Sequence, residues 1–312
     1  MKMLLNSKMK YFVVLTFVIL QFSGCENTPT EVANYQRQPI LSAFLVNGQP
    51  FEEAWLERGA GMNDVYAMES AGIDDATMYI SSLGDTLNLV PDPNVKGRYI
   101  PAAGENLIPQ GLQSYRIDAW TAAPRNEHLW ATSLVPGSID ENGPMEVFLV
   151  SDDLQDTTEV AEGDTLNRTM NTMVWSWNDV DSIGGFQGVI IAQTPREDLV
   201  PLDPDWEPPA DPTDEDDDNY IEPFDRERAR WTFMRHDQRQ ITIAWIFFGW
   251  EGPQKVQFNA LSGAYYDYLF SLIQSKFGAV DRPEYNINGG LGIFGAYSTH
   301  SINIYMERVN IE

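Results

Sequence analysis

Short runs with a two-residue hydrophobic period fill the chain from Ile40 to about Pro136. Ala76, Met78 and Ile80 alternate with Thr77 and Tyr79, and the run from Tyr115 to Ala119 repeats this pattern. Such alternation is typical of strands that bury one face. Turn residues such as Asn47-Gly48 and Pro109-Gln110-Gly111 separate the runs. The pattern predicts an immunoglobulin-like β-sandwich over residues 39–137.

Extended runs resume after the loop-like stretch 137–144 and predict a second β-rich domain over residues 138–312. Within the extended segment Gln240–Phe248, the run from Ile241 to Phe248 is apolar on nearly both faces, which is typical of a central strand. One helix is expected over 262–277, with Ser262 as its N-cap, Gly278 as its stop and an apolar stripe packed on the sheet. The stretch 197–227 is rich in proline and acidic residues and is expected to be a surface insertion. The predicted fold class is therefore mainly β, with two antiparallel β-sandwich-like domains, the second carrying one packed helix and an acidic loop.

The first residues have the layout of a signal peptide. Three lysines and no acidic residue are followed by the apolar run Phe12–Leu20, which is too short to cross a bilayer core. The run leads into Phe22-Ser23-Gly24-Cys25, which resembles a lipobox, and Cys25 is the chain's one cysteine. We expect residues 1–24 to be removed, Cys25 to be lipidated, and residues 25–38 to form a tether. The alternative is an N-terminal anchor helix with a chance cysteine.

The charge of the chain excludes one class of partner. The formal charge of the whole sequence is -26, and removing residues 1–24 with Lys2, Lys8 and Lys10 makes it -29. A chain this acidic is repelled by nucleic-acid phosphates and by anionic headgroups. We therefore expect no nucleic-acid partner, and the charge also has the simple interpretation of solubility outside the cytoplasm.

Glycine recurs between residues 289 and 295, where Gly290, Gly292 and Gly295 fit the G-x-G-x-x-G dinucleotide fingerprint. That fingerprint needs a following helix and an acidic residue about 20 positions further on, and too little chain follows Gly295. The preferred interpretation is a tight loop or a close approach of two backbones.

No catalytic constellation can be read from the sequence. The histidines are His128, His236 and His300, and no G-x-S-x-G elbow or metal-binding spacing is present. Acidic residues are too abundant to nominate a pair for acid–base catalysis. We therefore predict that the protein is not an enzyme, with a hydrolase assembled by tertiary contacts as one alternative. Among the tryptophans, Trp206 is the candidate for an exposed sugar platform, whereas Trp175, Trp177 and Trp245 are expected in the core.

The acidic insertion has a spacing that resembles an EF-hand calcium loop. Its candidate ligands are Asp214, Asp216, Asp218, Tyr220 through its carbonyl, and Asp225. A short aspartate in the last position and Pro223 count against such a loop, and a solvated acidic loop is the preferred interpretation. Apart from this calcium site, no cofactor is predicted.

Several segments resemble a family of Bacteroidota lipoproteins that share a domain of unknown function. The most specific is the run from Asn286 to Tyr297, with Gly289, Gly290, Gly292 and Gly295 as a signature loop. Weaker matches are Asp75–Ile80, Gly97–Tyr99, Ile108–Ile117 and Ala131–Pro136. The resemblance implies an outer-membrane, lipid-anchored protein, exposed at the cell surface in some members, that accompanies a TonB-dependent β-barrel transporter. It carries over no catalytic residues, and a structural or adhesive cell-surface β-protein is the other alternative.

Overall fold

The computed structural model describes residues 37–59, 71–140, 146–150, 157–167, 172–194, 198, 200–202, 228–243 and 248–308. Residues Gln38–Glu312 make up one compact unit, and Met1–Arg37 make up another.

The unit is mainly β, as the hydrophobic period predicts. The strands in the first part of the chain are β1 Pro39–Val46, β2 Ala54–Arg58, β3 Thr77–Ser82, β4 Asp85–Pro91, β5 Arg98–Pro101, β6 Ser114–Trp120 and β7 His128–Leu134. Those in the second part are β8 Glu146–Val150, β9 Thr157–Glu159, β10 Thr165–Asn167, β11 Thr172–Ser176, β12 Gly185–Ala192, β13 Arg228–Arg235, β14 Gln240–Ile243, β15 Gly252–Leu261 and β16 Leu291–Glu307. The helix α3 spans Gly263–Lys276.

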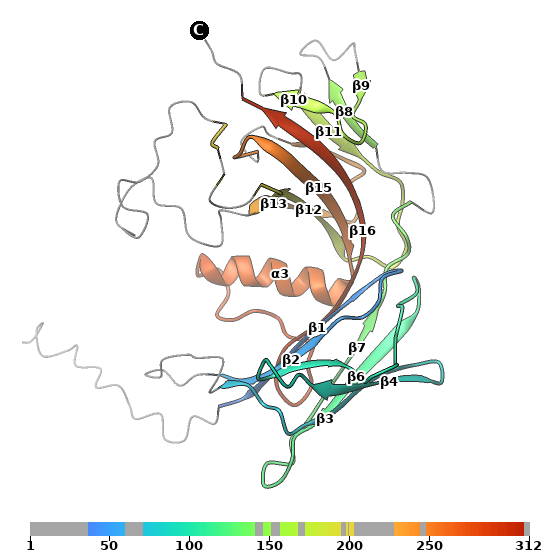
Figure 1. Cartoon of the computed structure of the whole chain (residues 1–312), viewed down its shortest axis with the longest axis vertical. Helices are drawn as coiled ribbons and strands as arrows, with labels where there is room; N and C mark the ends of the chain where they lie inside the picture. Colours follow the sequence, from blue (N-terminus) through green and yellow to red (C-terminus); the bar gives the residue numbers. More distant parts are fainter. Residues whose placement is uncertain are drawn as a thin grey trace, which may run out of the picture. The chain divides into compact units, whose positions relative to one another are not determined.

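These strands form two sheets. The larger has twelve strands in the order β13-β12-β15-β16-β1-β2-β5-β4-β3-β6-β7, with β10 also paired to β16, and the smaller has the order β14-β11-β8-β9. Most pairs are antiparallel, but β1 and β10 both pair with β16 in parallel. The 17-residue strand β16 therefore runs past both groups of strands and connects them (Figure 1).

Two hydrophobic cores lie along β16. The first contains the inward side chains of β1 to β7 together with Phe294 and Ala296 from the first half of β16. The large sheet folds back on itself around this core, because Trp130 of β7 forms a bridge with Asn288, just before β16. The second core contains Ile304 and other side chains from the second half of β16. The domain boundary near residue 137 stays a prediction, but each half of the chain contributes most of one core.

The second core packs the small sheet on the large one. Trp175 of β11 is 1% exposed, and its ring lies 5.9 Å from that of Phe258 on β15. Trp177 lies 4.6 Å from the Phe258 ring and 5.0 Å from the Phe186 ring on β12. Trp175 and Trp177 are thus core residues, as predicted, whereas Trp245 lies outside the described residues. Both indole N–H groups are buried without a hydrogen-bond partner among the described atoms.

The helix has the bounds that its caps predict, but Ser262 acts differently from the expectation. It occupies the N-cap position without a side-chain hydrogen bond to the helix. Instead, its Oγ accepts a hydrogen bond of 3.2 Å from the amide of Ala296 in β16. Ser262 therefore ties the start of α3 to the large sheet.

One expected strand is described only in part. Residues 244–247 of the expected central strand 240–248 lie outside the described residues, and its first part, β14, pairs with β11 alone among the described strands. Ile243 is buried, whereas Gln240 and Thr242 are exposed. The alternation within β14 is therefore that of a half-exposed strand.

Candidate functional site

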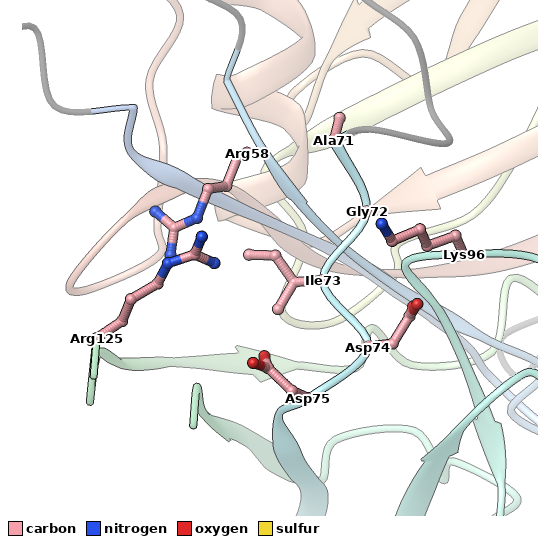
Figure 2. A pocket seen from close by; sticks show the side chains of 8 residues that line it. All are labelled: Arg58, Ala71, Gly72, Ile73, Asp74, Asp75, Lys96 and Arg125. Atoms are coloured by element: carbon pink, nitrogen blue, oxygen red, sulfur yellow. The ribbon is translucent and has the colours of Figure 1, made fainter. Parts of the chain in front are cut away.

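A pocket of about 400 Å³ opens where β2 ends and three connecting segments meet it. Arg58 ends β2, Lys96 comes from the β4–β5 loop, and Arg125 comes from the β6–β7 loop (Figure 2). The other described lining residues are Ala71, Gly72, Ile73, Asp74 and Asp75. Three cationic and two anionic side chains therefore gather around one opening.

Two backbones cross in close contact beneath this opening. Gly97, at φ +79°, donates its amide to Asp74 at 2.6 Å and accepts the amide of Leu56 through its carbonyl at 2.8 Å. A Cβ on Gly97 would lie 2.8 Å from the Cα of Gly72. Few L-residues adopt this φ, and a side chain on Gly97 would not fit between the two backbones. Glycine therefore allows the Lys96 loop to lie this close to the segment that carries Asp74.

A buried tyrosine holds the segment that carries the two carboxylates. The Tyr99 hydroxyl donates to the carbonyl of Ile73 at 2.9 Å and accepts the amide of Ala76 at 3.0 Å. Asp74 and Asp75 lie between these two bonded residues, so Tyr99 fixes their backbone at the pocket wall. Burial raises the pKa of Tyr99 to about 12, so its hydroxyl stays neutral over the physiological range.

We expect Tyr99→Phe to lower the free energy of unfolding by about 1–3 kcal/mol, because it leaves a buried carbonyl and a half-buried amide without their partner. Since the folded-state pKa of Tyr99 is raised, the wild-type chain should also lose stability as pH rises from about 10 to about 12. The variant should lack this part of the pH dependence. Urea unfolding at several pH values measures both effects.

The matched control is Tyr79→Phe, because Tyr79 is half-buried on the outer face of β3. Its effect should stay within about 0.5 kcal/mol. Equal losses in the two variants would show that the hydroxyl of Tyr99 does not hold the pocket wall.

The cationic wall is organised by Glu127. Arg58 donates through both terminal nitrogens to the two carboxylate oxygens of Glu127, and Thr121 Oγ1 donates to Glu127 at 3.3 Å. The hydrogen bonds from Arg58 hold the pKa of Glu127 below its usual value, and the charge of Arg125 adds to this against the opposing effect of burial. The Arg58 guanidinium is thus fixed in one orientation, and its side chain is only 15% exposed.

Arg125 completes this wall from the β6–β7 loop. Figure 2 shows the Arg58 and Arg125 side chains pointing toward one another on one side of the pocket, with Ile73 and Asp75 on the other. Guanidinium groups bind carboxylates and phosphates through paired, charge-assisted hydrogen bonds. The site can therefore hold an anionic group at the arginines and a hydrogen-bond donor at the carboxylates. None of the described lining residues carries a hydroxyl, a thiol or an imidazole.

The outer face of β3, β6 and β7 carries a separate aromatic and charged cluster. Its members are Tyr79, Arg116, Asp118, Trp120, His128 and Trp130. The Trp120 ring stacks on His128 at 4.3 Å, and the Arg116 guanidinium lies 4.4 Å from the Trp130 ring centre. Asp118 is buried beneath them; burial alone would raise its pKa, but hydrogen bonds from Arg116 and His128 outweigh this and lower it. One face of the Trp120 ring and one face of the Trp130 ring thus contact neighbouring side chains, and Trp120 remains 36% exposed.

The predicted site residues lie in several places. Cys25 and the calcium-loop residues Asp214, Asp216, Asp218, Tyr220 and Asp225, as well as Trp206, lie outside the described residues. Within the described residues, no group of three or more His, Cys, Asp or Glu side chains could hold a metal ion.

The signature glycines lie where the last strand meets its neighbours. Gly289 and Gly290 precede β16, and a Cβ on them would lie 2.1 Å from the carbonyl oxygen of His128 and 2.5 Å from that of Pro39, respectively. Gly292 lies inside β16 against Leu41 of β1, and Gly295 lies against the Tyr265 ring. The segment thus enters a strand, whereas a dinucleotide fingerprint enters a helix. At Gly289, Gly290 and Gly292 two backbones thus approach closely. These glycines are far in sequence from Arg58 and Arg125 of the pocket.

The pocket residues could not be nominated from the sequence. Arg58 and Arg125 are 67 positions apart in the chain, and each is an ordinary charged residue at the end of a strand or in a turn. No sequence motif indicates that the backbones at Gly72 and Gly97 lie in close contact. The one local sign is the segment Asp74-Asp75 directly before a strand, and this is too common among the acidic residues of this chain to be specific.

Comparison with known proteins adds little. No protein-family model matches the chain, and no curated protein matches it. One similar solved structure is the crystal structure of chicken CNTN1 FN1-FN3 domains, with 7% sequence identity and a TM-score of 0.19 over 86% of this chain and 99% of that one. No conclusion about fold or function follows from a likeness of this level. In the described part of the chain, no helix is long and apolar enough to span a membrane.

Proposed function

We propose that this protein is a non-catalytic, lipid-anchored binding protein of the outer membrane that captures a small ligand with an anionic group. The ligand would bind at the Arg58–Arg125 wall of the pocket and pass to a TonB-dependent β-barrel transporter. The observation that carries the proposal is the convergence of two guanidinium groups from distant segments at a pocket of about 400 Å³.

Charge placement supports this function. The chain has 46 acidic and 20 basic residues, whereas the described lining of this pocket has three basic side chains and two acidic ones. The acidic surface repels a large polyanion at many points at once. A small anion contacts only the region around the arginines, and salt screens its repulsion by more distant acidic groups. The pocket therefore suits a compact carboxylate or phosphate ligand better than a nucleic acid.

The location and the partner are supported by the sequence. The short apolar run that ends in Ser23-Gly24-Cys25 supports lipid attachment, and the resemblance to Bacteroidota lipoproteins supports a transporter as the partner. The rigid setting of Arg58 by Glu127 fits a binding role, because a prepositioned guanidinium loses little freedom when a ligand binds.

Calorimetric titration with inorganic phosphate and with citrate tests the pocket. We expect saturable binding of at least one probe, and Arg125→Gln should weaken it by about tenfold to 100-fold, because one charge-assisted hydrogen bond is lost. Arg125 is exposed and is the better test, since Arg58 also pairs with Glu127.

The matched control is Arg239→Gln, which removes an exposed arginine that pairs with Asp179 outside the pocket. It should leave the affinity unchanged. Equal affinities of the two variants, or heats that do not saturate for either probe, would contradict an anion site at this pocket.

A further inference from the structure

The charges that line the pocket balance once Glu127 is counted. Glu127 accepts hydrogen bonds from Arg58 through both carboxylate oxygens, so these two side chains form a neutral pair. The other charges of the described lining are two cations and two anions, on Lys96, Arg125, Asp74 and Asp75. A ligand with charge of one sign meets repulsion from half of these groups. A ligand that carries both signs can match both halves.

The two carboxylates of the lining differ in what they already bind. Asp74 accepts the amide of Gly97 at 2.6 Å, so its carboxylate holds the loop that carries Lys96. Asp75 is exposed, and it accepts no hydrogen bond and forms no ion pair with another residue that the structure describes. Asp75 is thus the carboxylate that can pair with a cationic group of a ligand.

Arg125 faces Asp75 across the pocket without pairing with it. Figure 2 shows Arg125 on one side of the pocket and Asp75 on the other. The backbones of both residues are held: the amide of Arg125 donates to the carbonyl of Ala122 at 3.2 Å, and the amide of Ala76, next to Asp75, donates to the Tyr99 hydroxyl at 3.0 Å. Two opposite charges therefore face one opening from fixed positions.

The lining also has an apolar part. Ala71 and Ile73 are buried hydrophobic residues of the pocket wall, and Ile73 belongs to the segment that leads to Asp75. The pocket volume of about 400 Å³ lies toward the lower end of the range for small-molecule sites, about 300–1,000 Å³. These features suit a small ligand whose short carbon skeleton joins two charged ends.

We propose that the pocket selects zwitterionic ligands, whose carboxylate binds at Arg58 and Arg125 and whose ammonium group binds at Asp75. This inference rests on the anion binding proposed for the Arg58–Arg125 wall. Free amino acids and short peptides share this chemistry and differ in the distance between the two groups. Both ends of such a ligand meet charges that are already in place, so little conformational freedom is lost on binding.

Calorimetric titration with ω-amino acids tests this selection. Glycine, γ-aminobutyrate and ε-aminocaproate carry the same two groups at increasing separation, so they distinguish a site for free amino acids from one for short peptides. Acetate, butyrate and caproate are the matched acids without an ammonium group, and hexylamine lacks the carboxylate. We expect at least one ω-amino acid to bind about tenfold more tightly, or better, than its matched acid and than hexylamine.

Asp75→Asn tests the position of the ammonium group, because it keeps the size of the side chain and removes its charge. It should weaken the best ω-amino acid by about tenfold to 100-fold, since a charge-assisted hydrogen bond is lost. It should not weaken the matched acid, which has no group for Asp75 to bind.

The matched control is Asp85→Asn, which removes the same charge from an exposed residue outside the pocket lining. It should leave both affinities unchanged. Because Asp75 has no hydrogen bond to lose, Asp75→Asn should also unfold in urea at the same midpoint as the wild-type chain.

The outcomes separate this inference from the anion site itself. If ω-amino acids bind no more tightly than their matched acids while phosphate or an acid still saturates and depends on Arg125, the anion site stands and the selection of zwitterions is wrong. Equal losses for the ω-amino acid and its matched acid in Asp75→Asn would overturn the role of Asp75. If no acid, phosphate or ω-amino acid gives a saturable heat, the proposed function fails together with this inference.

Discussion

Replacing Gly292 with alanine is expected to lower the free energy of unfolding by about 3–5 kcal/mol, because two separate costs add. Gly292 has φ +108°, where L-residues are strained. A Cβ there would also lie 2.1 Å from the carbonyl oxygen of Leu41, inside the parallel pairing of β1 with β16. The backbone of β1 would have to move, and β1 connects β16 with the rest of the first core. Urea unfolding followed by tryptophan fluorescence measures the loss.

A matched glycine separates the two costs. Gly104 has φ +84°, and a Cβ on it would meet nothing within 4 Å. Gly104→Ala should therefore show the conformational cost alone, about 1 kcal/mol. If both variants lose the same amount, the close approach of β1 and β16 is not what requires glycine at 292, and the signature segment needs another explanation.

The architecture could be predicted from the sequence only where the pattern is local. Alternation in the runs around Met78 and Ile117 indicates strands because each residue's burial follows the period of the strand itself. The helix bounds follow from Ser262 and Gly278, which mark the ends of an apolar period. In contrast, the parallel pairing of β1 with β16 joins residues about 250 positions apart, such as Leu41 and Gly292. No turn sequence indicates that two such distant strands pair.

The partner strands of β14 show a second limit. The hydropathy of a segment does not distinguish a neighbouring strand from other packing, so it predicts burial but not which strands lie beside it. In the structure Ile243 enters the core beside β11, whereas Thr242 stays exposed. Which strands flank a segment is a property of the whole sheet, so the period of one segment cannot decide it.

The candidate pocket was beyond prediction for a related reason. Arg58 can be recognised as a site residue only once the structure shows that Glu127 orients it and that Arg125 lines the same pocket. Both of these residues belong to the β6–β7 region. Gly72 lines the pocket and lies against Gly97, and this close contact joins two segments 25 positions apart in the chain. Charged residues at turns are usual on any surface, so their convergence is visible only in three dimensions.

Cys25→Ser is expected to move the protein from the membrane fraction to the soluble fraction of the cell envelope. The reason is the size of the hydrophobic contribution: each buried methylene contributes about 0.8 kcal/mol, one acyl chain binds marginally, and several chains on one residue anchor durably. Serine offers no thiol for acylation, so the variant carries no acyl chain at this position. Fractionation of the envelope measures the shift, and incorporation of labelled palmitate reports the modification itself.

The matched control for this shift is Phe22→Leu, which changes a residue three positions before Cys25 toward the amino acid usual in a lipobox and keeps the cysteine. It should leave the protein in the membrane fraction with palmitate attached. If Cys25→Ser stays in the membrane as well, the anchor is not the lipid, and the segment Phe12–Leu20 must hold the chain as an uncleaved helix. In that case the N-terminal residue of the purified protein would be Met1, whereas processing at the lipobox makes it Cys25. The length of the mature chain therefore distinguishes the two anchors independently of where the protein fractionates.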